Sequence, residues 1–302
     1  MNSGIFSAIA AAFFYSCSNY IDKFLLEKQR LNYYLITIYS GIFGFIVGLG
    51  VALVVGIYTG DILTILLVVG SGFLINISLL PYYKTLSMDE TSRIIPLFSV
   101  IPVFTIIMGY LLLGELLSGN QYIGSFFIIV ASLVISMEKP SLNIFKLRKS
   151  FWYLMLSCFL YSLSLILYKF VANDIPFFQA LTYEGVGVLL CSVVLLLNKS
   201  IRRMFVKNSK RIKKKVYGFI FINESINLVA VYFYWFSLTT ISAGLASTIM
   251  QGIQPLITLF FGIVLTVLLP RLIKEDIGGT NLIWKASCIV VMFIGLYFIF
   301  LP

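Results

Sequence analysis

The sequence predicts an all-α polytopic membrane protein with ten transmembrane helices, arranged as two inverted five-helix repeats. Three observations predict it: ten long apolar segments, basic residues confined to alternate gaps between them, and sequence matches between the two halves. Of the 302 residues, 60% are hydrophobic and 11% charged, which is far outside the range of soluble domains. Because backbone polar groups in lipid must be bonded internally, we expect the segments to be helices.

Each apolar segment is long enough to cross a hydrocarbon core of about 30 Å at about 1.5 Å per helical residue. In chain order the segments cover residues 3–22, 33–58, 62–87, 91–113, 119–137, 151–172, 177–198, 216–238, 243–268 and 282–301. No basic residue precedes the first segment, so we expect a membrane span there and not a cleaved signal peptide.

Charge predicts the orientation of these spans. Twenty-one of the 22 Lys and Arg residues follow the first, third, fifth, seventh and ninth segments, and Lys169 is the exception. Since Lys and Arg are retained in the cytoplasm, both termini are expected outside and the five basic loops inside. The formal charge of +10 then belongs to a rim that faces anionic lipids, and we expect no nucleic-acid partner. The abundance of Ile, Phe, Tyr and Lys suggests an AT-rich prokaryotic genome and therefore the plasma (inner) membrane.

The two halves carry opposite charge bias and match each other in three places. In order, the matches pair FFYSCSNYIDKF (13–24) with FLYSLSLILYKF (159–170), YYLITIYSG (33–41) with FFQALTYEG (177–185), and IPVFTIIMG (101–109) with QPLITLFFG (254–262). We expect one transmembrane domain made of a first repeat (1–138), a basic cytoplasmic linker (139–150) and a second repeat (151–302). Inverted repeats are typical of secondary transporters, whose substrate site lies near the midplane between the halves.

Two acidic residues, Glu184 and Glu224, fall deep inside predicted spans, whereas the other ten lie in loops or near span ends. A bare carboxylate at such a depth costs at least ~2.5 kcal/mol, so each must be protonated, paired or in contact with water. The functional interpretation is cation recognition or proton coupling. The structural alternative is a protonated Glu in an interhelical hydrogen bond, with Asn227 as a candidate partner of Glu224.

Aromatic residues accompany both carboxylates. Tyr183 adjoins Glu184, and Tyr232 lies about two helical turns beyond Glu224. A carboxylate beside aromatic faces suits an organic cation. The alternative is that these rings belong to the aromatic belts found at membrane interfaces.

A second pattern repeats between the first and sixth segments. Tyr15 and Lys23 are eight residues apart, as are Tyr161 and Lys169, so each pair lies on one helix face. In inverted repeats Lys23 belongs near the cytoplasmic end and Lys169 near the outer end. They are candidate gates, or their long side chains reach the membrane interfaces without any such role.

Other residue types limit the chemistry. The sequence has no histidine, and its four cysteines fall inside spans without a CxxC pair, so we expect no cofactor and no metal. No Asp is placed deep in a predicted span, and no nucleotide-binding loop is present. These features argue against an intramembrane enzyme and against ATP-driven transport. Gly44 and Gly48 form a GxxxG pattern that predicts close helix packing.

The stretch from residue 92 to 136 resembles the repeat of the drug/metabolite transporter superfamily, EamA-like branch. Its proline-containing helix ends in Gly114-Glu115, and Gln121 and Gly124 begin the next helix. The second copy keeps Gln254-Pro255 but has Leu268-Leu269-Pro270 where Gly-Glu would stand. The resemblance implies a ten-helix secondary carrier of small metabolites, a family whose solutes are diverse.

We therefore expect a secondary active transporter of a small organic metabolite, working by alternating access and coupled to protons if the buried carboxylates titrate. The alternative is a flippase for a lipid or lipid-linked sugar, which the same fold could serve. The expected partners are the small-molecule substrate and membrane lipids. The sequence is compatible with a monomer.

Overall fold

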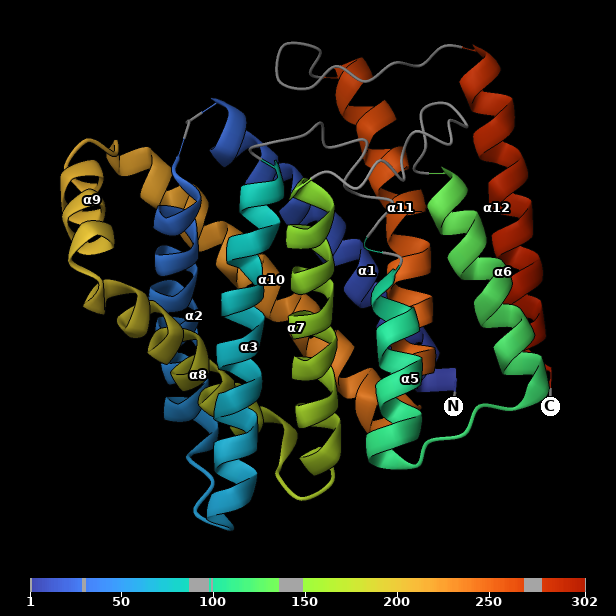
Figure 1. Cartoon of the computed structure of the whole chain (residues 1–302), viewed down its shortest axis with the longest axis horizontal. Helices are drawn as coiled ribbons and strands as arrows, with labels where there is room; N and C mark the ends of the chain where they lie inside the picture. The colour runs from blue at the N-terminus through green and yellow to red at the C-terminus, as the bar shows by residue number, and fades with distance from the viewer. Residues whose placement is uncertain are drawn as a thin grey trace.

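The computed structural model describes residues 2–28, 31–86, 98, 100–135, 149–268 and 279–301, and the regular elements within these ranges are all helices (Figure 1). The first half contains α1 (Asn2–Lys23) with a π-helical turn (Phe24–Lys28), α2 (Tyr33–Val55), α3 (Ile62–Leu86), α5 (Ile101–Leu113) and α6 (Gly119–Ile135). The second half contains α7 (Lys149–Val171), α8 (Phe177–Leu197), α9 (Lys199–Ser209), α10 (Lys214–Thr240), α11 (Ala243–Leu268) and α12 (Gly279–Phe300).

Seven of the predicted segments coincide with helices that are long and apolar enough to cross a membrane. Over the described residues these are Asn2–Leu26, Tyr33–Val55, Ile62–Thr85, Phe151–Val171, Phe177–Leu197, Lys214–Thr240 and Ala243–Gly262. The fourth, fifth and tenth segments coincide with α5, α6 and the apolar part of α12 (Val290–Phe300), which are shorter in the described ranges. The all-α class is confirmed, whereas the number of ten spans stays a prediction.

Two elements differ from the expectation. The first segment is predicted to end at residue 22. In the structure α1 ends at Lys23, and a π-helical turn then continues the helix to Lys28. The basic stretch after α8 is a helix, α9, and not a loop. The side chain of Asn198 begins α9 by accepting hydrogen bonds from the backbone N–H groups of Ser200 (2.9 Å) and Ile201 (3.3 Å).

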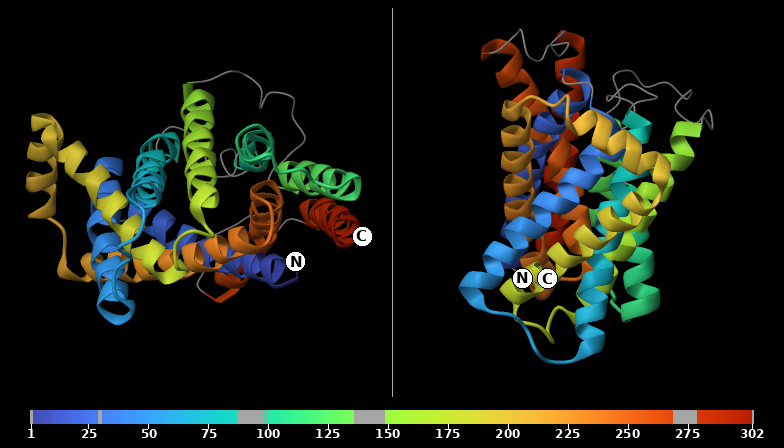
Figure 2. Two further views of the ribbon diagram at one scale, coloured as in Figure 1. Left: turned by 90° about the horizontal axis from the view of Figure 1, so that it is seen from below. Right: turned by 90° about the vertical axis from the view of Figure 1, so that its left-hand side faces the viewer.

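The helices of the two halves pack mainly against each other. α2 packs on α8, α6 on α12 and α5 on α11, while α1 packs on α10 and α3 on α7. Figures 1 and 2 show α6 and α12 side by side at one edge of the bundle and α9 at the opposite edge. Both ends of the chain lie toward the same end of the bundle (Figure 1).

The GxxxG pattern lies in the contact between α2 and α8, as predicted. A Cβ atom added to Gly48 would lie 3.3 Å from the Cα of Gly185, and one added to Gly44 would lie 3.1 Å from Val188 Cγ2. The glycines thus allow the two backbones to approach closely, which stabilises helix pairs in lipid.

Gly114 ends α5 with a left-handed backbone conformation (φ 67°), which glycine adopts without steric cost. The N–H of the next residue, Glu115, donates to the carbonyl of Gly109 at 3.0 Å and closes the turn. The Gly-Glu pair therefore places Glu115 at the end of α5, where its side chain leaves the helix.

Candidate functional site

A cavity of about 140 Å³ lies between the two halves of the protein. Its wall combines aromatic rings, hydroxyl and amide groups and one carboxylate from α1, α3, α5, α7, α10, α11 and Phe98. The lining residues are Tyr15, Asn19, Asp22, Ser78, Leu79, Tyr82, Tyr83, Phe98, Ile101, Ser157, Tyr161, Asn227, Met250, Gln251, Gln254, Pro255 and Thr258.

Matched residues of the two halves meet in the wall of this cavity. The hydroxyl groups of Tyr15 and Tyr161, which occupy equal places in the first repeated motif, are 3.4 Å apart. Both tyrosines were candidate gate residues, and both lie in the wall of the cavity. A gating role for either of them stays a prediction.

The serines that follow these tyrosines make equivalent hydrogen bonds. Ser16 donates to the carbonyl of Gln254 at 3.3 Å, and Ser162 donates to the carbonyl of Ile101 at 3.3 Å. Ser16 matches Ser162 in the first motif, and Gln254 matches Ile101 in the third. A serine of each half therefore donates a hydrogen bond to a backbone carbonyl of the other half, and the two bonds join the same pair of motif positions.

Asp22 is the charged side chain in the described wall of the cavity, and it is only 6% exposed. Its Oδ1 accepts hydrogen bonds from Asn223 Nδ2 (2.9 Å) and Tyr83 OH (3.3 Å). Asn223 is oriented by Ser18, whose hydroxyl donates to Asn223 Oδ1 at 2.8 Å. Asp22 lies near the end of α1, where the first predicted segment ends, and the π-helical turn from Phe24 to Lys28 continues the helix beyond it.

Glu224 and Glu184 are both buried, with 8% and 4% of their surface exposed, but neither is in the described cavity wall. Glu224 Oε1 accepts a 2.6 Å hydrogen bond from the hydroxyl of Ser40 on α2. Glu184 lies where α8 crosses α3, since a Cβ atom added to Gly72 would lie 2.3 Å from its carbonyl oxygen. Ser40 on α2 matches Glu184 on α8 in the second repeated motif. Glu224 therefore contacts, in the first half, the position that Glu184 occupies in the second half.

The remaining predicted neighbours lie in different places. Asn227 is in the cavity wall, whereas Tyr183 donates its hydroxyl to the backbone carbonyl of Tyr58. Tyr232 packs in an aromatic cluster, with its ring centroid 4.9 Å from that of Phe177 and 5.5 Å from that of Phe178. Neither tyrosine lines the described cavity, and a substrate role for either stays a prediction.

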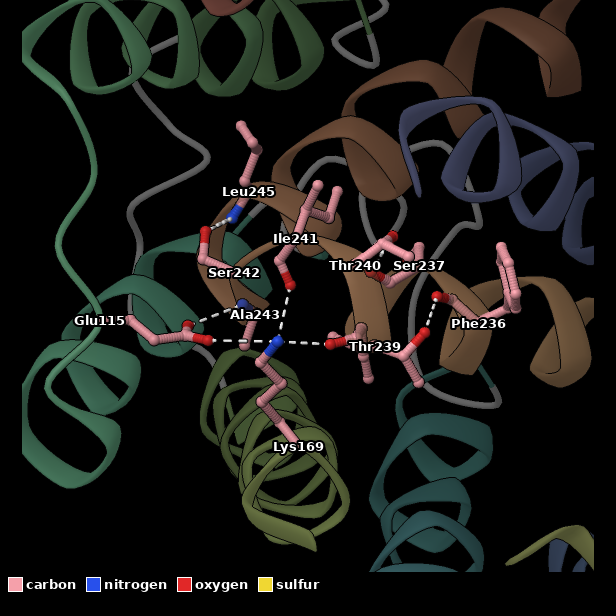
Figure 3. A network of polar contacts seen from close by, with 11 residues as sticks. Glu115, Lys169, Phe236, Ser237, Thr239, Thr240, Ile241, Ser242, Ala243 and Leu245 are labelled. Atoms are coloured by element: carbon pink, nitrogen blue, oxygen red, sulfur yellow. Dashed lines mark hydrogen bonds and ion pairs between the residues drawn. The ribbon is translucent and has the colours of Figure 1, made fainter. Parts of the chain in front are cut away.

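Lys169, the basic residue that breaks the charge pattern, lies in a polar network between the halves (Figure 3). Its Nζ is 3.5 Å from Glu115 Oε1, and each side chain is 17% exposed. It also donates to the carbonyls of Leu238 and, at 2.8 Å, Ile241, at the end of α10. The Lys169 ammonium is therefore bonded to protein groups, and it is not a side chain that only extends into the membrane interface.

Glu115 belongs to the same network and caps the N-terminus of α11. Its Oε2 accepts the backbone N–H of Ala243 at 2.7 Å, and Ala243 is the first residue of α11. A carboxylate at a helix N-terminus and an ammonium at a helix C-terminus both complement the helix dipole. We call Lys169 and Glu115 the end clamp. The side chain of Lys23, the other candidate gate, lies outside the described part of the structure.

Two residues of this site were not singled out as site residues from the sequence. Asp22 lies seven residues after Tyr15, close to two helical turns, and this spacing places both on one face of α1. Glu115 was noted as part of a motif, but its partner is 54 residues away in the other half. Among the described residues, no three His, Cys, Asp or Glu side chains are grouped closely enough to hold a metal ion.

Comparisons with known proteins agree with this architecture. A solved structure titled only as the crystal structure of a protein is similar to this chain, with a TM-score of 0.70 at 12% identity, covering 99% of this chain and 97% of that one. At that identity the likeness shows the fold alone. No curated protein matches the chain. The family model described as the EamA-like transporter family matches residues 2–137, so the first half of the chain is similar to that family of membrane transporters.

Proposed function

We propose that the protein is a secondary active transporter that moves a small organic metabolite by alternating access. The observation that carries this proposal is the cavity between the two halves, together with the end clamp on one side of it. The match of residues 2–137 to a transporter family supports the same function.

We further propose that the chain forms ten spans as two inverted five-helix repeats, covering residues 1–138 and 151–302 with a linker at 139–150. The exchanged packing of α1 on α10 and of α3 on α7 supports this arrangement. The equivalent hydrogen bonds of Ser16 and Ser162 support it at the level of single residues. An inverted repeat lets one half take the conformation of the other, which is how alternating access is achieved around a central site.

The cavity extends toward one end of the bundle. Its wall runs from Tyr15 and Tyr161 to Asp22 and Tyr83, near the ends of α1 and α3. Lys169 lies eight residues beyond Tyr161 on α7, about 12 Å toward the opposite end. By the positive-inside rule the clamped end, where the chain begins and finishes, faces outward. We therefore assign this conformation as closed to the outside of the plasma membrane, with the cavity on the cytoplasmic side.

The size of the cavity favours a small solute over a lipid-linked sugar. Pockets for drug-sized ligands occupy about 300–1,000 Å³, whereas this cavity has about 140 Å³. A flippase needs a path for a head group that stays joined to its lipid. The described cavity is bounded by side chains from six helices and Phe98, which suits a compact solute.

Cysteine accessibility tests this mechanism without knowledge of the substrate. In a chain whose Cys17, Cys158, Cys191 and Cys288 are replaced by Ser, Asn19→Cys places one thiol in the cavity wall. A membrane-impermeant thiol reagent should label it in inside-out vesicles and hardly at all in right-side-out vesicles.

Adding Lys169→Met should open the clamped end and increase labelling in right-side-out vesicles several-fold. Ala8→Cys is the matched control, because Ala8 is completely buried on the same helix outside the described cavity wall. Equal labelling of Asn19→Cys from both sides, unchanged by Lys169→Met, would argue against alternating access.

A further inference from the structure

The charge of the cavity wall is unbalanced. Among its described lining residues Asp22 carries the formal charge, and the others are aromatic, apolar, hydroxyl or amide side chains. A carboxylate removed from water is costly unless a cation or several hydrogen bonds compensate it. A ligand of this cavity is therefore expected to carry a positive charge that compensates Asp22.

The hydrogen bonds to Asp22 leave one of its oxygens available. Both donors, Asn223 Nδ2 at 2.9 Å and Tyr83 OH at 3.3 Å, bond to Oδ1. Among the described residues no hydrogen bond ends on Oδ2. The bond from Ser18 to Asn223 at 2.8 Å keeps the amide turned toward Asp22. The carboxylate is thus held in one orientation, with its second oxygen bonded to none of the described residues.

Two described lysines lie on α3 and α7, which line the cavity, and both have other partners. Lys84 on α3 lies 2.8 Å from Tyr153 OH, with its ammonium 4.0 Å from the centre of that ring. Lys169 is held by Glu115 and by the end of α10. Neither of these two ammonium groups compensates Asp22 in this conformation.

The rest of the wall suits an ammonium group. Tyr15, Tyr82, Tyr83, Phe98 and Tyr161 surround the cavity, and aromatic faces attract a cation through the ring quadrupole. Asn19, Asn227 and Gln254 in the wall are amide side chains that suit hydrogen bonds to a polar group elsewhere on the ligand. Anionic metabolites are disfavoured, because they would bring a second negative charge to a buried carboxylate.

We infer that the transported solute is a small organic cation whose ammonium group binds Asp22 against this tyrosine wall. The inference rests on the proposed transport function and names its substrate class. It assigns Asp22, and not Glu184 or Glu224, as the residue that contacts the charge of the solute.

Equilibrium binding to the purified full-length protein tests this inference. The probes are choline and tetramethylammonium, the neutral choline isostere 3,3-dimethyl-1-butanol, and acetate as a small anion. Isothermal titration should show saturable binding of the two cations at least tenfold tighter than of the neutral isostere, and no binding of acetate. Tighter binding of acetate, or equal binding of choline and its isostere, would overturn the inference.

Substitution assigns the effect to one residue. Asp22→Asn should weaken choline binding at least tenfold and abolish the preference over the neutral isostere, while Asp174→Asn, at an exposed position, should change neither. Should Asp22→Asn fail to fold, Asn227→Trp fills the cavity from α10 and should abolish choline binding. Choline binding that survives either change in a folded protein contradicts the assignment.

The two proposals can fail separately. If thiol labelling alternates between the two sides but no cation binds, the transport mechanism stands and the substrate class is wrong. If cations bind through Asp22 but labelling never changes side, the cation site stands and the transport function is wrong.

Discussion

Lys169 and Glu115 form an ion pair of 3.5 Å that joins the end of α7 to the turn after α5. The same two side chains bond to Ile241 and Ala243, which flank the turn between α10 and α11. Four helices from both halves are thus tied at one end of the bundle (Figure 3). The cavity extends toward the other end, and this asymmetry supports the proposal of a transporter in one of two conformations.

Breaking the end clamp should destabilise this conformation. Glu115→Gln or Lys169→Met leaves the other charge partly buried without its partner, which we expect to cost about 2–3 kcal/mol. Thermal unfolding in detergent measures the loss as a lower Tm. The double substitution should cost less than the sum of the single ones, because the two residues are in contact. If the losses in the free energy of unfolding for the two single substitutions add up to that of the double one, the ion pair contributes nothing to stability.

Removing Asn223 should damage the network that orients Asp22. Asn223→Ala removes one hydrogen bond to Asp22 and one to Ser18, both buried, so we expect a loss of about 1–3 kcal/mol in stability. Ser225→Ala is the matched control, because the Ser225 hydroxyl bonds only to its own helix at Phe221, with no other partner among the described residues. Equal Tm values for the two variants would contradict the structural importance of this network.

The contact between α2 and α8 should tolerate no large side chain. Gly48→Leu adds atoms to a position whose Cβ would already lie 3.3 Å from the Cα of Gly185 and from the carbonyl oxygen of Leu181, so we expect a cost of about 1–3 kcal/mol. Gly50→Leu, two residues along the same helix, meets no atom within 4 Å and should leave the Tm nearly unchanged. A similar loss for both variants would indicate a general effect of leucine in α2.

Glu224 is the residue for which we predict proton coupling. Glu224→Gln keeps the shape of the side chain and can still bond Ser40, but it cannot release a proton. In proteoliposomes, a pH gradient should drive accumulation of choline by the wild-type protein and not by Glu224→Gln, whereas exchange of choline across the membrane should persist. Wild-type pH dependence in the variant would exclude Glu224 as the coupling residue.

The membrane-spanning helices could be predicted from the sequence because hydrophobicity and helix length are local properties. Seven predicted segments coincide with described helices to within a few residues at most ends. The repeated motifs also predicted which residues correspond, and Tyr15 and Tyr161 lie together as matched positions of inverted halves should. Local signals failed at α9, where a basic stretch counted as a loop is an amphipathic helix.

The members of the site depended on tertiary structure. Asp22 lies near the end of an apolar segment, and only the packing of α3 and α10 against α1 buries it, with Tyr83 and Asn223 as its partners. Tyr183 and Tyr232 lie near buried glutamates in the sequence but contact other residues than the described cavity wall, because proximity along a helix does not determine which face meets a neighbouring helix.

The sequence by itself therefore determined the class of protein and the position of most of its helices, and it predicts an internal duplication, because these follow from composition, periodicity and matches along the chain. Only the tertiary structure decided that Asp22 is the charge of the cavity wall and that Lys169 is paired with Glu115. The physical reason is that the cost of a buried charge is set by its partners, and those partners come from helices far away in the sequence.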